Sequence, residues 1–339
     1  MALFRRTSET ATPLTGVDLV LADLDGVVYT GPNAIPYAVD SLNSVAETVR
    51  VGYITNNASR TDASVAGHLS DLGLRVEPRD VVTSPQAAVR LLSEHVPAGS
   101  TILVVGGDGL VDEVQKGGFS VTRSAEDDPA AVIQGFAPEV GWTQLAEAAF
   151  ALQGRSDSER PWIATNTDWT IPVARGIAPG NGTLVSAVHT AAGRLPLVAG
   201  KPEVAIFHEA IARFQAKTPL FIGDRLDTDI LGANRAGIAS VLVLTGIDRA
   251  KQLLAAEADS RPTYILRDLR GLDEPYPEAK TARSGAVTVG KSTVGIEGNE
   301  VRILSEGDDE LDLLRAACAA IWDSGRAIYG LDVPERLYA

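Results

Sequence analysis

Two aspartates two positions apart, in the sequence Asp23-Leu24-Asp25-Gly26, directly follow an apolar run at residues 17–22. The run predicts a mostly buried β-strand that ends in a turn. Because side chains alternate between the faces of a strand, Asp23 and Asp25 are expected to point the same way at its end. Two carboxylates aimed at one point repel each other, and burying them uncompensated is costly, so the pair indicates a cation. The alternative is a solvated acidic turn that Gly26 permits.

Composition limits the kinds of protein this chain can be. Its 339 residues are enough for two or more domains, and 45% hydrophobic with 22% charged residues is typical of a soluble globular protein. A net charge of −14 argues against nucleic acid or an anionic membrane surface as the main partner. The single cysteine, Cys318, suits a reducing compartment, and no apolar stretch has transmembrane length. The expected location is therefore the cytoplasm.

Apolar runs alternate with helical patterns along most of the chain, which predicts βαβ units. We expect an α/β fold with a doubly wound parallel sheet, a Rossmann-like core formed by residues 1–84 and 196–278. Residues 85–195 contain a complete set of strands and helices of their own and are expected to form an inserted α/β cap domain. The expected core strands are 18–22, 51–55, 219–222 and 240–244, the core helices 38–49, 63–72, 205–214 and 227–236, the cap strands 101–105, 131–134 and 162–165, and the cap helices 86–94, 142–152 and 183–191.

A third segment, residues 284–339, is predicted to be a small α+β extension. Short strands are expected at 286–289, 295–297 and 300–304, followed by a helix from about 310 to 324 that Asp308 or Asp309 caps. Some fifty residues are marginal for independent stability, so we expect the extension to pack on the rest of the protein. It resembles a fragment of an acetyltransferase fold, although no acetyl-CoA loop is evident.

Two further motifs could bind anionic oxygens at strand ends. Thr55-Asn56-Asn57 closes the expected strand 51–55 with a hydroxyl and two amides. Gly200-Lys201-Pro202 provides a close backbone approach and a compact positive charge that can contact a phosphoryl oxygen. Taken singly, the first could be an ordinary asparagine turn and the second a surface lysine before a helix.

The fourth motif runs from Gly223 to Asp229, directly after the expected strand 219–222. Asp224 is predicted to lie beside Asp23 and to complete a hard oxygen site for Mg²⁺. Asp227 is assigned as the N-cap of the following helix. Asp229 is expected to lie behind the metal ligands or to be a weak ligand itself, since Mg²⁺ usually keeps several waters.

Together the four motifs resemble those of the haloacid dehalogenase superfamily of phosphatases. The match is to Asp-x-Asp-Gly, the strand-end Thr55, the Lys201 motif and Gly-Asp-x-x-x-Thr-Asp, and it covers about residues 17–275. The insertion between Thr55 and Lys201 looks like the C2-type cap of the subclass that includes NagD and the phosphoglycolate and pyridoxal phosphate phosphatases. Residues 164–168, Ala-Thr-Asn-Thr-Asp, look like a stretch of that cap.

The resemblance implies roles for these residues. Asp23 would attack phosphorus and form an aspartyl-phosphate, while Asp25 would act as general acid and then as general base. Mg²⁺ would be held by Asp23, Asp224 and the backbone carbonyl of Asp25. The residues expected to hold the other phosphate oxygens are Thr55, Asn56, Asn57 and Lys201.

Other reactions compete with phosphomonoester hydrolysis. A dehalogenase needs neither Mg²⁺ nor a second acid, so Asp25 counts against it, whereas a phosphomutase shares all four motifs. A receiver-like signalling protein combines an acidic pair with a phosphorylatable aspartate, threonine and lysine. It carries its phospho-acceptor on another strand, however, and has no insertion of this size.

The substrate is expected to be a small phosphorylated metabolite. The overall match is close to actinobacterial members of the subclass with a C-terminal tail, which favours glycerol 3-phosphate. Phosphoglycolate is the nearest alternative, followed by a nucleotide or pyridoxal phosphate. We also expect a homodimer, formed through the cap or the C-terminal extension.

Overall fold

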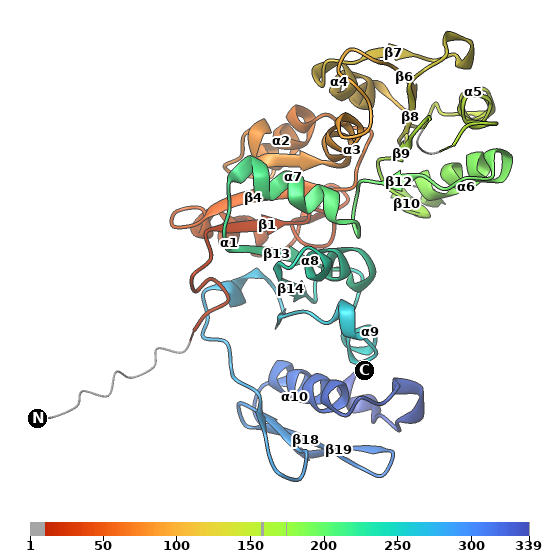
Figure 1. Cartoon of the computed structure of the whole chain (residues 1–339). Coiled ribbons are helices and arrows are strands. Elements are labelled where there is room, and N and C mark those ends of the chain that lie inside the picture. Colours follow the sequence, from red (N-terminus) through yellow and green to blue (C-terminus); the bar gives the residue numbers. More distant parts are fainter. Residues whose placement is uncertain (1–10, 157–158, 174, 339) are drawn as a thin grey trace, which may run out of the picture. The chain divides into compact units, whose positions relative to one another are not determined.

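Parallel sheets flanked by helices form the structure, a computed structural model (Figure 1), which confirms the expected α/β fold. It describes residues 11–156, 159–173 and 175–338. The chain divides into two compact units: a first unit from Met1–Arg50 and Thr218–Ala339, and a second unit, Val51–Lys217. The domain boundaries expected from the sequence stay a prediction.

The first unit contains four parallel strands in the order β15-β14-β13-β1. Strand β1 is buried at all four positions, as expected for a parallel strand covered on both faces. The bounds of the strands are β1 Leu19–Ala22, β2 Tyr29–Thr30, β3 Asn33–Ala34, β13 Pro219–Gly223, β14 Ala239–Val243 and β15 Tyr264–Leu266. The helical segments are α1 Ala38–Val45, the π-helix η3 Leu226–Ile230, α8 Leu231–Arg235, α9 Ala250–Leu254, η4 Ala258–Ser260 and η5 Leu269–Leu272.

The helix predicted at 227–236 begins differently from the prediction. Its first turn is the π-helix η3, and the N-cap residue is Arg225, so the assignment of Asp227 as N-cap is wrong. The Asp227 carboxylate instead accepts hydrogen bonds from the Arg225 guanidinium, at 2.8 and 3.0 Å. Asp229 supplies the physical reason, because its carboxylate accepts from the backbone N–H of both Asp224 (3.1 Å) and Arg225 (3.2 Å). Both N–H groups at the start of the helix therefore donate to Asp229, which lies in the first turn itself.

The second unit contains two groups of parallel strands. Strands β4 and β5 pair in parallel, and a five-stranded sheet has the order β12-β9-β8-β6-β7. The strand predicted at 131–134 and the helix predicted at 142–152 are confirmed as β8 and α5. The strands are β4 Arg50–Thr55, β5 Val81–Thr83, β6 Thr101–Val105, β7 Ser120–Thr122, β8 Ala131–Gln134, β9 Trp162–Ala164, β10 Thr170–Val173, β11 Gly176–Pro179 and β12 Leu197–Val198. The helical segments are α2 Asp62–Asp71, η1 Pro78–Asp80, α3 Ser84–Ser93, α4 Asp108–Lys116, η2 Ala125–Asp127, α5 Trp142–Leu152, α6 Asn181–Ala192 and α7 Val204–Phe214.

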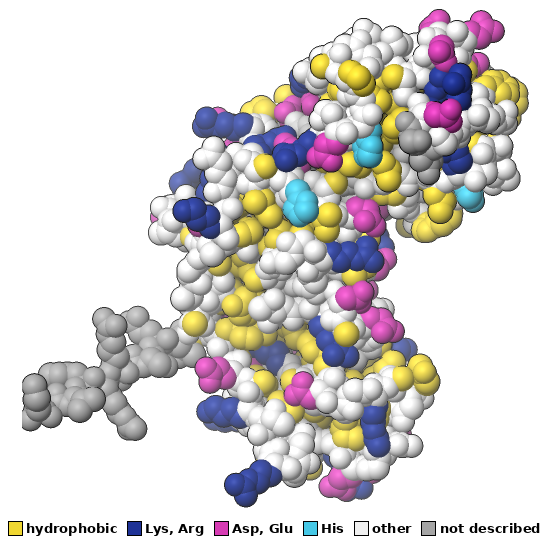
Figure 2. All heavy atoms as spheres, in the orientation of Figure 1, with side chains coloured by type: hydrophobic (Ala, Val, Ile, Leu, Met, Phe, Trp, Pro, Cys, Tyr) yellow, Lys and Arg dark blue, Asp and Glu magenta, His cyan; other side chains and the backbone are white. Residues whose placement is uncertain are grey.

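The surface mixes charges of both signs. On the face drawn in Figure 2, Lys and Arg side chains are interspersed with Asp and Glu. Within the described ranges, no helix combines the length and apolar character needed to cross a bilayer.

The C-terminal extension forms an antiparallel sheet covered by one helix. In Figure 1 helix α10 lies over strands β18 and β19, and α10 packs on β18 and β17. The predicted cap is confirmed as Asp309, whose carboxylate accepts from the Leu311 N–H at 2.9 Å. The elements are β16 Lys280–Thr281, β17 Val287–Val289, β18 Ser292–Glu297, β19 Glu300–Ser305, α10 Glu310–Asp323, η6 Ile328–Gly330 and η7 Glu335–Leu337.

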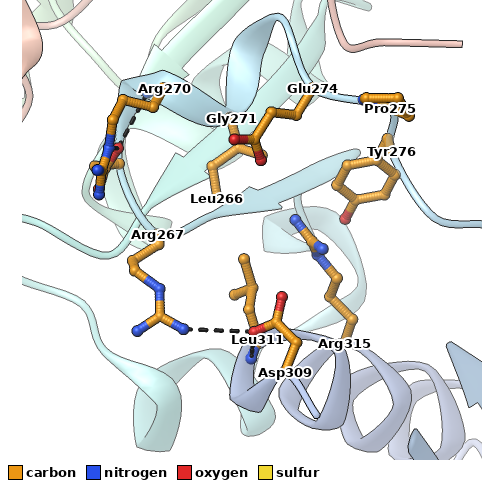
Figure 3. A pocket seen from close by; sticks show the side chains of 11 residues that line it. Leu266, Arg267, Arg270, Gly271, Glu274, Pro275, Tyr276, Asp309, Leu311 and Arg315 are labelled. Carbon is orange, nitrogen blue, oxygen red and sulfur yellow. Dashed lines mark hydrogen bonds and ion pairs between the residues drawn. The ribbon is translucent and has the colours of Figure 1, made fainter. Parts of the chain in front are cut away.

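A cavity of about 280 Å³ lies where the extension meets strand β15 and its following loop (Figure 3). Arg315 of α10 lies over the Tyr276 ring, 4.4 Å from its centroid, and donates to the Ile265 carbonyl at 2.7 Å. Arg267 reaches Asp309 at 3.5 Å. The arginines at this junction therefore join the extension to the core by bonds to both backbone and side chains.

The N-cap of α10 gives a first test of this packing. Asp309→Ala removes the acceptor for the Leu311 N–H, so we expect a loss of about 1 kcal/mol in the free energy of unfolding, measured by urea denaturation. Asp308→Ala is the matched control, since Asp308 is exposed and pairs with exposed Lys291. It should lose less than about 0.5 kcal/mol. Equal losses in the two variants would contradict the assigned cap.

Candidate active site

Three buried carboxylates meet at the carboxyl end of strands β1 and β13. Ligand atoms of Asp23, Asp224 and Asp229 all lie within 4.8 Å of one another, and the three residues are 8%, 2% and 1% exposed. The register explains the meeting, because β1 pairs in parallel with β13 and the Asp23 N–H continues the ladder to the Ile222 carbonyl at 2.8 Å. Parallel strands end at the same edge of a sheet, so residues that follow them become neighbours. The predicted approach of Asp224 to Asp23 is confirmed.

The second acid of the first motif lies apart from this cluster. Asp25 follows the end of β1 by three residues and is exposed, in a turn where the Leu24 carbonyl accepts from the N–H groups of Val28 (2.8 Å) and Tyr29 (3.1 Å). Its carboxylate is not among the clustered ligand atoms found within the described residues. The two aspartates therefore differ in solvation, since Asp23 is buried and Asp25 is exposed.

Glycines leave the space that the Asp224 carboxylate occupies. Gly26 has a positive φ of +79°, and a Cβ there would overlap the Asp224 carboxylate and lie 3.0 Å from the Gly246 Cα. A Cβ on Gly246 would overlap the same carboxylate, and one on Gly223 would overlap the side chain of Asp229. In the sequence Gly26 indicates a turn, and the structure adds its close approach to a carboxylate.

A loop that the sequence analysis did not single out orients Asp224. In this loop, residues 245–248, the Ile247 N–H donates to Asp224 Oδ2 at 2.6 Å and the Asp248 N–H donates to the Asp224 carbonyl at 3.1 Å. Thr245 Oγ1 donates to the Gly26 carbonyl at 2.7 Å. The available signal was its position, since Thr-Gly directly after the expected strand 240–244 is another turn at the same edge of the sheet.

Asp248 also anchors the start of η3. Its carboxylate accepts from the Leu226 N–H at 2.6 Å. Partial burial raises the pKa of the Asp248 carboxyl above its usual range, an effect that the Leu226 N–H partly offsets. The 245–248 loop therefore contacts both acidic motifs through backbone and side-chain bonds.

The remaining predicted site residues lie in the second unit. Thr55 ends β4, is 3% exposed, and its Oγ1 accepts from the Asn57 N–H at 3.1 Å. Asn57 is itself exposed, and its side-chain oxygen accepts from the Ser59 N–H at 2.9 Å. Lys201 follows β12 and is 4% exposed. A lysine this buried is held by its surroundings, unlike the surface lysine that the sequence left as an alternative.

Asn56 connects these segments of the second unit. Its Oδ1 accepts from the Lys201 N–H at 2.8 Å, and its amide nitrogen donates to the Lys201 carbonyl (3.1 Å) and to Asp168 (3.2 Å). Its own carbonyl accepts from Ser84 Oγ at 2.7 Å and from the Asn166 amide at 2.8 Å. The Asn56 side chain therefore fixes the backbone of Lys201.

Gly200 is needed for this arrangement. A Cβ there would lie 2.5 Å from the Thr165 carbonyl and 2.6 Å from Asn56 Oδ1. The backbone at Gly200 therefore lies close to Thr165, Asn166 and Asn56.

The acidic cluster suits a hard divalent cation. Carboxylate oxygens are the ligands that Mg²⁺ and Ca²⁺ prefer, and the three carboxylates, each at least nine-tenths buried, require a compensating positive charge. The glycines around Asp224 and Asp229 leave the space that these carboxylates occupy. The residues present therefore fit the expected Mg²⁺.

Gly26→Ala tests the close approach to Asp224. The positive φ costs an L-residue about 1–2 kcal/mol and the overlap about 1–3 kcal/mol more, so we expect a total loss of about 2–5 kcal/mol in unfolding free energy. The rise in melting temperature on adding MgCl₂ should also shrink. Gly31→Ala is the matched control, because Gly31 has a φ of +59° with no atom within 4 Å of the added Cβ. It should show only the conformational loss. Identical behaviour of the two variants would refute the close approach.

Comparison with known proteins agrees with this geometry. Residues 20–120 match the family model of haloacid dehalogenase-like hydrolases, and residues 198–272 match a second model of HAD-like hydrolases. Residues 290–332 match a GCN5-related N-acetyltransferase-like domain, which confirms the resemblance expected for the extension.

Individual relatives cover most of the chain. D-glycerol 3-phosphate phosphatase of Mycobacterium tuberculosis is 42% identical over 91% of this chain and 87% of its own length. Human chronophin is 35% identical over 75% of this chain and 92% of its own. A crystal structure of glycerol phosphate phosphatase from M. tuberculosis in complex with magnesium superposes with a TM-score of 0.86, at 40% identity over 96% of each chain.

These findings confirm the family expected from the four motifs and Mg²⁺ as its cofactor. They leave the receiver-like alternative without support. This chain belongs to the haloacid dehalogenase-like hydrolases and is a phosphatase of that family.

Proposed function

We propose that the protein hydrolyses glycerol 3-phosphate to glycerol and phosphate, with Asp23 as nucleophile. The observation that carries the chemistry is the buried carboxylate cluster with an exposed acid, Asp25, two residues after one of its members. The substrate assignment is supported by the M. tuberculosis phosphatase of glycerol 3-phosphate, which this chain matches over most of its length, the extension included.

The reaction proceeds in two displacements. An Asp23 oxygen bonds to phosphorus while the bond from phosphorus to the ester oxygen breaks, and Asp25 protonates the departing alkoxide. In the second displacement the water oxygen bonds to phosphorus while Asp25 takes a proton from that water. The bond between phosphorus and the Asp23 oxygen breaks, and phosphate is released. The exposure of Asp25 suits this change of role, because it must exchange protons with both alcohol and water.

Asp23, Asp224 and the backbone carbonyl of Asp25 would hold Mg²⁺, with Asp229 behind them. The bound ion supplies positive charge that offsets the charge on the phosphoryl oxygens. Asp229 is suited to a supporting role, because its carboxylate accepts from the N–H of Asp224 and thereby fixes that ligand's backbone.

We further propose that Thr55, Asn57 and Lys201 contact the phosphate oxygens. Each follows a strand end of the second unit and provides a hydroxyl, an amide or a positive charge. Asn56 was also expected to bind phosphate, and this stays a prediction. Its bonds to the backbone of Lys201 favour instead a role in positioning the lysine. The inserted cap, residues 85–195, would select the leaving group.

Partners and location follow the sequence expectations. We propose a cytoplasmic enzyme whose partner is a small phosphomonoester, in keeping with its single cysteine and acidic net charge. The homodimer expected through the cap or the extension stays a prediction.

Replacing the two aspartates separates their roles. Asp23→Asn should abolish turnover of every phosphomonoester. Asp25→Asn should lower kcat/KM for glycerol 3-phosphate by about 10²–10⁴-fold, but lower kcat/KM much less for 4-nitrophenyl phosphate, whose leaving group needs little protonation. Asp227→Asn is the control, since this exposed acid bonds only to Arg225 in the structure. Appreciable turnover by Asp23→Asn, or equal losses on both substrates for Asp25→Asn, would contradict the mechanism.

A panel of phosphomonoesters with Mg²⁺ tests the substrate. Glycerol 3-phosphate should give the highest kcat/KM, ahead of phosphoglycolate, pyridoxal phosphate and nucleotides. The substrate assignment is wrong if any of these exceeds glycerol 3-phosphate by more than an order of magnitude.

A further inference from the structure

The C-terminal extension shares one hydrophobic cluster with the segment that carries Asp229. From the core the cluster includes Leu226 and Ile230 of η3 and Leu253 and Leu254 of α9. From the extension it includes buried side chains of β17, β18, β19 and α10, among them Cys318 and Ile321. The apolar interior beneath the acidic motif is therefore completed by residues about ninety positions further along the chain.

Helix α9 joins this cluster to the 245–248 loop. The helix begins at Ala250, directly after the loop whose N–H groups at Ile247 and Asp248 bond to Asp224. Any change in the direction of α9 would move these donors. The loop also holds Gly26 through Thr245, so both acidic motifs depend on where α9 starts.

The extension supplies much of what holds α9. The helix has five residues, too few for stability without packing, and Leu253 and Leu254 are 0% and 3% exposed within the shared cluster. It packs against α10, and in Figure 1 it lies between β14 and the extension. Lys251 of α9 lies over the ring of Tyr338 near the C-terminus, 5.7 Å from its centroid.

A second connection runs from the end of α9 to the end of α10. Arg261 donates to the Ala256 carbonyl, just after α9, at 3.3 Å. The same guanidinium lies over the Trp322 ring, 5.5 Å from its centroid, and donates to the Trp322 carbonyl at 3.5 Å. Both ends of α9 are thus tied to the extension.

We infer that the extension is a positioning element for the metal site: α10, through α9 and the 245–248 loop, sets the orientation of the Asp224 carboxylate. The inference rests on the proposed role of Asp224 as a metal ligand. Residues that orient metal ligands typically change metal affinity by 10–100-fold when replaced. Cavities made in α9 or α10 should therefore weaken Mg²⁺ binding although no residue there contacts the ion.

The test compares buried cavities in the two units of the full-length protein. Leu254→Ala in α9 and Ile321→Ala in α10 should each raise the Kd for Mg²⁺ about tenfold, measured by calorimetric titration of MgCl₂. Hydrolysis should return close to the wild-type kcat at saturating Mg²⁺. Leu152→Ala, in the separate hydrophobic cluster of α5, is the matched control, because Leu152 is also a fully buried helical leucine. Its Kd should stay within twofold of wild type.

Milder substitutions keep the inference testable if the alanine variants do not fold. Ile321→Val should raise the Kd for Mg²⁺ at least twofold, whereas Ile163→Val, at a fully buried position of β9, should not. Unchanged Kd values in the α9 and α10 variants, or an equal rise in the controls, would overturn the inference. Asp224→Asn distinguishes this outcome from failure of the proposed function: if Asp224→Asn does not weaken Mg²⁺ binding, the metal assignment itself is wrong.

Discussion

Mutual repulsion among Asp23, Asp224 and Asp229 is the constraint on which the first unit depends. Three buried carboxylates within 4.8 Å of one another would oppose folding unless their charge is compensated. The Ile247 N–H donates to the Asp224 carboxylate, and the Asp224 N–H donates to the Asp229 carboxylate. Glycines stand where a side chain would collide with these carboxylates. The carboxylate oxygens of this cluster suit a hard cation such as Mg²⁺.

The extension packs against the helical turn that carries one of these carboxylates. About fifty residues bury too little surface to be stable alone, and here they complete a cluster that includes the helix turn bearing Asp229. The acetyltransferase-like segment therefore contributes to the phosphatase fold as packing. At the junction Arg315 of the extension donates to the Ile265 carbonyl of the core, and Arg267 of the core pairs with Asp309 of the extension, so both partners contribute bonds that hold α10.

In the second unit, the Asn56 side chain holds the backbone of Lys201 by hydrogen bonds. Asn56 satisfies both backbone groups of Lys201, and Ser84 and Asn166 in turn satisfy its own carbonyl. The lysine ammonium group stands on a flexible four-carbon stem, so a fixed backbone helps to define its position. The network links a strand end of β4 to the segments after β9 and β12.

The family, the α/β fold and the positions of the acidic motifs can be predicted from the sequence, because these are local patterns: apolar runs, strand-end carboxylates and short spacings. For the same reason the sequence predicts β8 and α5 correctly, and it limits the cap of α10 to Asp308 or Asp309, of which the structure has Asp309. It misassigned Asp227 because the helix start is satisfied by Asp229 and Asp248, and the second of these lies on a different strand connection.

Which residues support the site depends on the folded chain. Thr245 donates from its hydroxyl to the Gly26 carbonyl, Ile247 donates from its backbone N–H to Asp224, and Gly246 leaves room for that carboxylate. These contacts join segments far apart in the sequence and leave no recognisable pattern in it. The place of the extension beneath η3 likewise depends on packing between segments far apart in the chain, where any apolar side chain of suitable volume satisfies the pattern. The sequence identifies the acidic residues, and packing in the folded chain determines their positions.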